Sequence, residues 1–225
     1  MLRTISFSFN PFPEAPESFL PCPASMKEDA MKNGQLKPAY NVQHGVDAEY
    51  ITWLTVAPEL TDITTLIPFL KSMKENLNFK YLKIVDDAGY ESEENYSFIE
   101  ENNQISFIKP SNYEISKTRK YKNDISRIDN MDYDSESDLF ICQNGKKLTA
   151  NGVKIRKSKT GYESVKTIYI CEDCGNCNYK SQCIKGNNSK IPLEKRTKKF
   201  ETSKKFQKVQ QPVEKRFRQA EAGPS

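Results

Sequence analysis

The sequence predicts a mixed α/β protein, and three patterns lead to that prediction. Two segments rich in β-branched and aromatic residues, 39–46 and 50–56, are separated by a short polar turn, as in a hairpin. Apolar residues then recur at helical spacing after Asp62. A short apolar run ends on Asp86 and Asp87. Strands and helices that follow one another in this way pack as layers around a shared core.

Composition limits how much of the chain this core can hold. The chain has 225 residues, of which 36% are hydrophobic, and its formal net charge is +4. With the 9 glycines included the share is about 40%, which is below the ~45–50% usual for a globular domain. No apolar run reaches the ~18 residues of a membrane span, and the proline-containing N-terminus does not resemble a signal peptide. We therefore expect a cytoplasmic protein with a real core and long loops or tails.

Four regions are expected along the chain. Residues 1–25 contain several prolines, which remove backbone donors and block helices, so a poorly ordered leader is predicted. Residues 26–110 hold the α/β core. Residues 111–190 are expected to form a β-rich insertion, in which Asn144-Gly145 indicates a tight hairpin turn. Residues 191–225 are highly basic and are expected to form a helix or tail.

The helices of the core have local start signals. Asp62 is expected to cap a helix over 63–77, and Pro68 either bends this helix or lies in its first turn. Ser92 is expected to cap a second helix, over 92–102, because acidic residues follow it in the first turn.

The remaining strands of the core are short. They are expected at 82–86 and 105–108. The single histidine, His44, lies near the predicted hairpin turn and is interpreted as a turn residue.

The two aspartates at the end of the strand at 82–86 are the first candidate site. Neighbouring side chains of a strand point to opposite faces, so Asp86 and Asp87 are expected to differ in environment. Ligands of α/β sheets bind at such strand ends, and a carboxylate there can hold Mg²⁺. The alternative is an aspartate that caps the turn before Gly89, and spacing alone favours this alternative.

A cysteine cluster is the second candidate site. Four cysteines within thirteen residues have the spacing CxxCxxCx5C, and Cys142 on the preceding hairpin is a fifth thiol. Four thiolates bind Zn²⁺ tetrahedrally, which predicts a structural zinc site. Reduced thiols without metal, or an iron–sulfur or redox centre, are the alternatives. The four predicted ligands are Cys171, Cys174, Cys177 and Cys183.

Basic residues gather in the second half of the chain. The main stretches are 117–122, 154–159 and 195–216. Lysine and arginine clusters neutralise phosphates, so DNA is a candidate partner. A solvated surface without a partner is the alternative.

Several segments closely resemble DDE-type transposases of bacterial insertion sequences, in the branch with a cysteine-rich insertion in the catalytic domain. They are MKNGQLKPAYNVQHGVDAEYITW (31–53), TDITTLIPFL (61–70), DAGYESEENYSFIEENN (87–103) and the cysteine segment. The resemblance implies a ribonuclease-H-like mixed sheet with helices, and homo-oligomers in the intact family. It also implies two Asp and one Glu that hold two Mg²⁺ or Mn²⁺ ions for cleavage and transfer of DNA strands. Asp87 matches the second Asp.

The chain departs from the family pattern at both ends. Nothing before Met26 is similar to the motif IDGTKIEA, which carries the first Asp. After SKKFQKV (203–209) the sequence leaves the path to RSIQVEGxFGxxK, and Glu214 does not repeat that motif. We therefore expect a truncated transposase that lacks two of three catalytic carboxylates and is inactive. A catalytically dead DNA-binding remnant and a small zinc-binding module are the alternative functions.

Overall fold

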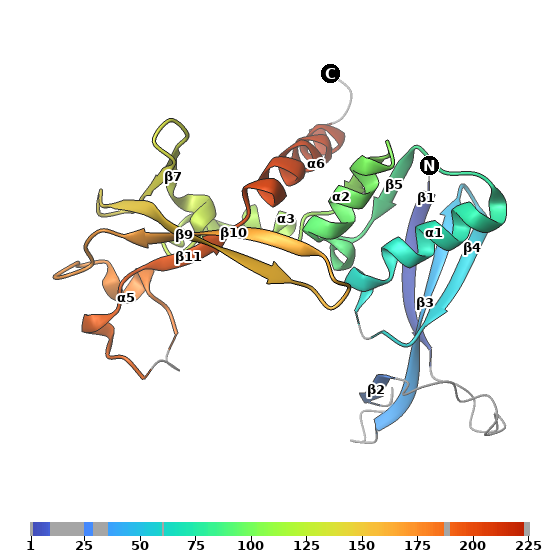
Figure 1. The fold of residues 1–225 in the computed structure, drawn as a ribbon, viewed down its shortest axis with the longest axis horizontal. Helices are drawn as coiled ribbons and strands as arrows, with labels where there is room; N and C mark the ends of the chain where they lie inside the picture. Colours follow the sequence, from blue (N-terminus) through green and yellow to red (C-terminus); the bar gives the residue numbers. More distant parts are fainter. Residues whose placement is uncertain (1, 10–24, 29–35, 60, 187–189, 223–225) are drawn as a thin grey trace. The chain divides into compact units, whose positions relative to one another are not determined.

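The computed structural model describes residues 2–9, 25–28, 36–59, 61–186 and 190–222. Its contacts divide the chain into two compact units. Unit 1 comprises residues 1–111 and 208–225, and unit 2 comprises residues 112–207. The two units are described separately below, and Figure 1 labels their elements. None of the helices in the described part of the chain has the length and apolarity that crossing a membrane requires.

Unit 1 is built on a mixed sheet. Strand β3 pairs antiparallel with β1 and β4, and the strands β1, β5 and β6 are parallel to one another in that order. Strand β2 pairs with the first residues of β3. The strands are β1 (Leu2–Phe9), β2 (Ser25–Glu28), β3 (Leu36–Asp47), β4 (Tyr50–Ala57), β5 (Lys83–Asp86) and β6 (Ile105–Ile108). The α/β class predicted from the sequence is confirmed.

The N-terminal segment differs from the sequence prediction. A leader without regular structure was expected over 1–25, but Leu2–Phe9 forms β1 between β3 and β5, and Ser25–Glu28 forms β2. Four of the eight residues in β1 are Ile, Thr or Phe, which favour strands. The proline-containing residues 10–24 lie outside the described residues.

The hairpin of β3 and β4 lies where it was predicted, and its turn is Ala48-Glu49. Ala48 has a positive φ of 54°, as tight hairpin turns require. His44 is not a turn residue: it lies within β3 and pairs with Leu54 of β4. The prediction for His44 was wrong because β3 extends three residues beyond it before the turn begins.

Helices and short 3-10 turns pack with this sheet in unit 1. They are η2 (Asp62–Thr64), α1 (Leu66–Leu77), η3 (Ala88–Tyr90), α2 (Glu93–Glu101) and most of α6 (Lys204–Ala222). Pro68 lies in the first turn of α1, where its missing N–H costs nothing. Ser92 caps α2 as predicted, and its Oγ accepts a hydrogen bond from the Asn95 N–H at 3.1 Å.

The core of unit 1 lies where these helices meet the strands β5 and β6. Helix α1 contributes four buried side chains to this core, and the others come from the sheet and from η3, α2 and α6. The fully buried hydrophobic residues among them are Leu66, Phe69, Met73, Ile84, Tyr90, Ile99 and Ile108. Strand β5 therefore lies between β1 and β6 in the sheet and also contributes the buried Ile84 to the core.

Unit 2 is built on an antiparallel sheet with the strand order β11-β10-β9-β8-β7. Its strands are β7 (Asp132–Asp134), β8 (Leu139–Ile141), β9 (Lys147–Lys157), β10 (Glu163–Cys171) and β11 (Lys199–Thr202). Its short helices are α3 (Tyr113–Ser116), α4 (Arg119–Lys122), η4 (Ile128–Asn130), α5 (Lys180–Cys183) and η5 (Leu193–Lys195). The unit is β-rich, as predicted for 111–190, and it extends to Gln207.

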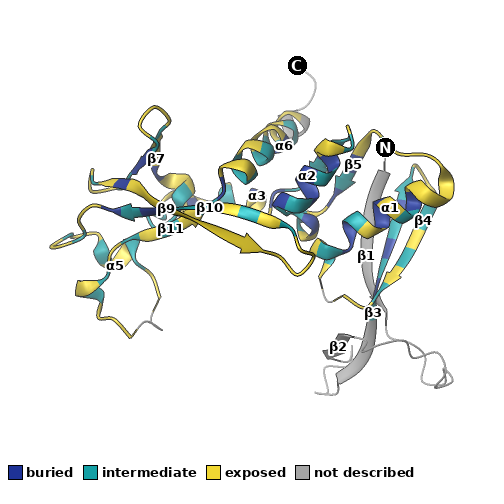
Figure 2. Ribbon diagram, viewed as in Figure 1, coloured by how far each residue is buried: buried dark blue, intermediate teal, exposed yellow. Residues whose placement is uncertain are grey.

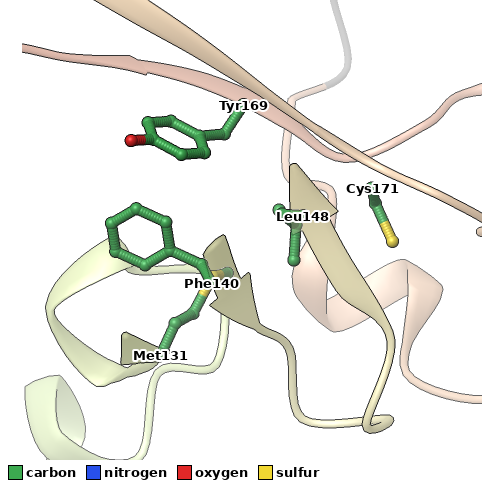
Figure 3. Close-up of a cluster of buried hydrophobic side chains, with 5 residues drawn as sticks. All are labelled: Met131, Phe140, Leu148, Tyr169 and Cys171. Carbon is green, nitrogen blue, oxygen red and sulfur yellow. The ribbon is translucent and has the colours of Figure 1, made fainter. Parts of the chain in front are cut away.

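A small aromatic core holds unit 2 together (Figure 3). The ring of Phe140 makes edge contacts with Tyr169 and Phe200, at centroid distances of 4.9 and 5.0 Å. Leu148 and Met131 complete the buried cluster together with Cys171. In Figure 3 the sulfur of Cys171 points away from the two aromatic rings.

The outer part of the hairpin formed by β9 and β10 has no such packing. All residues of β9 except Leu148 are exposed, as the yellow colour along β9 in Figure 2 shows. Val153, Ile155 and Val165 are exposed apolar residues of this hairpin. A two-stranded ribbon with both faces in solvent contributes little to a core.

Candidate functional site

The two aspartates after β5 have different environments, as predicted. Asp86 ends the strand and is 5% exposed, whereas Asp87 is exposed. Asp87 caps η3, and its Oδ1 accepts a hydrogen bond from the Gly89 N–H at 2.7 Å. The capping interpretation of Asp87 is therefore confirmed. Its role as a metal ligand stays a prediction.

A second carboxylate, from Asp62, approaches the same turn. A Cβ atom on Gly89 would lie 3.0 Å from Asp62 Oδ2 and 3.0 Å from Asp87 Oδ1. Both carboxylates thus border one small volume beside Gly89, which a side chain at this position would fill. Asp62 was not predicted as a site residue. From the sequence it was expected only to cap the apolar helix that follows it.

Asp62 is not the cap of α1. The helix begins at Leu66 after Thr65, and Asp62 starts the preceding turn η2. Its Oδ1 accepts a hydrogen bond from Asn41 Nδ2 on β3 at 2.7 Å, so its side chain is directed toward the sheet. The prediction was wrong because this long-range partner, 21 residues away, competes with the local helix terminus.

Buried amides hold the carboxylate loop, which we define as η2 and η3 with Asp62 and Asp87. Asn95 of α2 is 1% exposed and donates from Nδ2 to Ile63 O at 3.0 Å and to Tyr90 O at 2.8 Å. One side chain thus joins η2 to η3. Gln43 of β3, fully buried, donates to the Thr65 hydroxyl next to η2. Buried amides satisfied in this way hold the loop to the sheet.

The acidic residues do not fit the two-metal site that the resemblance implies. Within the described ranges, no three His, Cys, Asp or Glu side chains are arranged to hold a metal ion. The eight residues of β1, which pairs directly with β5, include no Asp or Glu. On α6, Glu214 pairs with Arg218 of the same helix at 2.6 Å. The residue of α6 that reaches the segment after Asp87 is an amide: Gln210 Nε2 donates to Glu91 Oε1 at 2.6 Å.

Unit 2 gathers its cysteines around one pocket. All four predicted ligands line it, and Cys142 lines it as well. Cys171 belongs to the buried core of the unit, and Cys142 and Cys174 pack against that core. The five thiols are free, with no disulfide among them. We refer to Cys142, Cys171, Cys174, Cys177 and Cys183 with these surroundings as the cysteine pocket.

Two tight turns bring the thiols together. Cys142 begins the turn between β8 and β9, where Gly145 N–H donates to Cys142 O at 2.8 Å and Gly145 has a φ of 71°. Cys171 ends β10, and the turn after it carries Cys174. Lys198, just before β11, donates its N–H to Cys174 Sγ at 3.4 Å and its Nζ to Cys183 O at 3.2 Å.

Burial affects two thiols of the pocket. It raises the pKa of Cys171 to about 12. It also raises the pKa of Cys183, against the opposing positive charge of Lys198. Nucleophilic and redox cysteines are recognised by a lowered pKa. Cys171 and Cys183 therefore lack the lowered pKa that would indicate a reactive cysteine.

Comparisons with known proteins give one match. Residues 141–223 match a family model described as Transposase DDE domain. No curated protein and no solved structure matches the chain. The matched segment includes the cysteine pocket and α6, and it begins after Asp87. Residues 141–223 are thus similar to the DDE domain of transposases.

Proposed function

We propose that this chain is a DDE-transposase-family protein of a bacterial insertion sequence that binds DNA in the cytoplasm and does not cleave DNA by itself. The observation that carries the proposal is the combination of a family-matched segment with an Asp87 that has no complete set of acidic partners among the described residues. The mixed sheet of unit 1, with Asp87 at the end of a central strand, agrees with a ribonuclease-H-like core.

The absence of cleavage follows from the donor set. Two metal ions that activate an attacking oxygen and a leaving oxygen need several carboxylate ligands. Asp62 is the carboxylate that borders the same volume beside Gly89 as Asp87, and its Oδ1 is already hydrogen-bonded to Asn41. Removing members of a catalytic set that acts as a unit abolishes most of the rate. We therefore derive no hydrolytic step at Asp87 in this chain.

A nuclease assay tests this part of the proposal. The full chain is incubated with supercoiled and linear DNA in the presence of Mg²⁺ or Mn²⁺, beside the variants Asp87→Asn and Asp132→Asn. Asp132 is an exposed aspartate of β7 in unit 2 and serves as the matched control. No metal-dependent cleavage is expected from any of the three. Cleavage that is lost in Asp87→Asn and kept in Asp132→Asn would overturn the proposal.

The hairpin of β9 and β10 is the surface that supports DNA binding best. Lys154 and Lys166 are directly opposite each other in its register. Like charges in this position destabilise a strand pair, whereas phosphates would be attracted to both. Arg156 of β9 forms an ion pair with Glu201 at 3.0 Å, which offsets part of this positive charge. Two-stranded ribbons of this kind fit the major groove of DNA.

The salt dependence of binding to a DNA duplex tests whether the hairpin of β9 and β10 contacts DNA. The double variant Lys154→Ala/Lys159→Ala removes two exposed cations of the hairpin, and Lys71→Ala/Lys74→Ala removes two exposed cations of α1. If both hairpin lysines contact phosphates, the slope of log K against log salt falls by about 1.8, at about 0.9 per phosphate contact. The α1 variant is expected to leave the slope unchanged. Equal slopes for both double variants would exclude the hairpin as the DNA contact.

A further inference from the structure

We propose that Cys142, Cys171, Cys174 and Cys183 bind one Zn²⁺ ion in the cysteine pocket, and that Cys177 is not a ligand. The proposal concerns unit 2 alone and does not depend on DNA binding. It changes the ligand set expected from spacing, because it replaces Cys177 by a cysteine that lies 29 positions before Cys171 in the sequence.

Core packing singles out three of the proposed ligands, and a contact of Lys198 adds Cys183 as the fourth. Cys171 lies in the buried core of unit 2, and Cys142 and Cys174 pack directly against that core. Lys198 connects the third and fourth ligands, through its N–H to Cys174 Sγ and its Nζ to Cys183 O. For Cys177 the structure records the pocket lining and a backbone hydrogen bond, from Lys180 N–H to Cys177 O at 3.0 Å.

The charge of the pocket suits an anionic metal centre. Zn²⁺ with four thiolates carries a net charge of −2. Three lysines line the pocket, namely Lys146, Lys180 and Lys198. An N–H group that donates to a ligand sulfur, as that of Lys198 does to Cys174, stabilises the thiolate form.

The thiols need only small rearrangements to bind. They line one pocket without forming a set of metal ligands in the structure. Rotation about one bond, Cα–Cβ, moves the sulfur of a cysteine between three staggered positions. Rotation about these bonds can direct four sulfurs to one point, and each thiol releases its proton as it binds. Four protein ligands leave no open position, so the ion would be structural and not catalytic.

Metal analysis and cobalt spectroscopy of the full chain test the proposal. The chain is purified under reducing conditions, its zinc and iron are quantified, and the apo form is titrated with Co²⁺. Near-stoichiometric zinc and the intense visible bands of tetrahedral cobalt thiolate are expected. Absence of bound zinc, or a predominance of iron, would overturn the proposal.

Two cysteine variants test the ligand set. Cys142→Ser is expected to weaken Zn²⁺ binding by more than about 100-fold, since even outer-shell partners contribute about 10- to 100-fold. Cys177→Ser is expected to keep the affinity and the cobalt spectrum of the wild type. Cys142→His, which restores a ligand, should recover zinc binding if Cys142→Ser folds poorly. Wild-type affinity in Cys142→Ser, or loss of binding in Cys177→Ser, would contradict the assignment.

Discussion

The carboxylate loop of unit 1 and the cysteine pocket of unit 2 are organised in opposite ways. In unit 1 the predicted metal ligand Asp87 is positioned by its own cap and by buried amides, but it forms no metal site with other acidic residues that the structure describes. In unit 2 five potential ligands converge on one pocket, although the loops that carry them are short. The carboxylate loop is thus held firmly by hydrogen bonds but offers few metal ligands. The cysteine pocket offers many ligands but lies on short loops.

The difference shows that a well-supported loop is not by itself a catalytic site. Asn95 and Gln43 would hold the loop in place whether or not Asp87 bound a metal, because their partners are backbone and hydroxyl groups. In the cysteine pocket the ligands themselves form part of the core. A bound metal would therefore stabilise unit 2 much more than unit 1. The following variants test how far the two regions are independent.

The largest effect is expected from Phe140→Ala in unit 2. Phe140 is 4% exposed and contacts Tyr133, Tyr169 and Phe200. Loss of a buried phenylalanine costs about 3–5 kcal/mol through lost burial and the cavity left behind. Urea unfolding monitored by circular dichroism should show this loss. The control Ile155→Ala, at an exposed position of β9, should change the free energy of unfolding by less than about 0.5 kcal/mol.

The single tryptophan makes this experiment specific to one unit. Trp53 is in β4 of unit 1, so its fluorescence reports the unfolding of that unit alone. If the units are independent, Phe140→Ala leaves the fluorescence transition at its wild-type urea concentration. An equal shift of the fluorescence transition would show that the two units unfold together and would remove the basis of the comparison.

Asn95→Ala is expected to have the next largest effect, in unit 1. The substitution leaves the carbonyl groups of Ile63 and Tyr90 without this donor, and each unsatisfied buried group costs about 1–3 kcal/mol. We expect a loss of about 2–4 kcal/mol in the transition followed by Trp53 fluorescence. The exposed Asn76, which bonds Ser72 O within α1, gives the matched control Asn76→Ala. Similar losses in both variants would refute the role of Asn95 in joining η2 to η3.

Local signals in the sequence were enough to predict most elements of unit 1. Ser92 with its acidic first turn located the start of α2, and the apolar run before Asp86 located β5. The failures involve partners distant in the chain. The β1 strand could not be predicted because its pairing with β3 joins residues about 40 positions apart, and prolines nearby suggested disorder. The position of Asp62 likewise depends on a partner distant in the chain, because its side chain is hydrogen-bonded to Asn41.

The cysteine pocket shows the same limit. The spacing of Cys171, Cys174, Cys177 and Cys183 located the pocket, since these residues lie on one short segment. Spacing alone could not rank Cys142 against Cys177 as a ligand, because that ranking requires the packing of the β8–β9 turn on the core.

Gly89→Ala is expected to have a smaller effect on the carboxylate loop. The added methyl group would lie 3.0 Å from oxygens of both Asp62 and Asp87, closer than side chains normally approach. Strain of about 1–3 kcal/mol is partly offset by the ~0.4–1 kcal/mol that Gly→Ala contributes through the unfolded chain. We expect a net loss of about 1 kcal/mol by Trp53 fluorescence. Gly175→Ala in unit 2, which would approach only the exposed Asp173 at 3.1 Å, should be close to neutral.

The smallest effect at neutral pH concerns Tyr121 of unit 2. Burial and the hydrogen bond that its hydroxyl donates to Asp129 raise the pKa of Tyr121 to about 12, against the opposing charge of Arg127. In the unfolded chain tyrosine ionises near pH 10. The unfolded state therefore releases this proton first, and stability from Tyr121 is complete below about pH 10 and falls between pH 10 and 12.

An ultraviolet titration of tyrosinate checks this prediction. The difference between wild type and Tyr121→Phe isolates one tyrosine, which should ionise near pH 12. In the Asp129→Asn background, the midpoint at which Tyr121 ionises should move toward pH 10. The reason is that no carboxylate then accepts the hydroxyl proton or repels the phenolate. Asp132→Asn changes an exposed aspartate of the same unit and should leave the titration of Tyr121 unchanged. A midpoint near pH 10 in the wild type would mean that Asp129 does not hold the hydroxyl of Tyr121, so that one of the contacts joining α4 to η4 is absent.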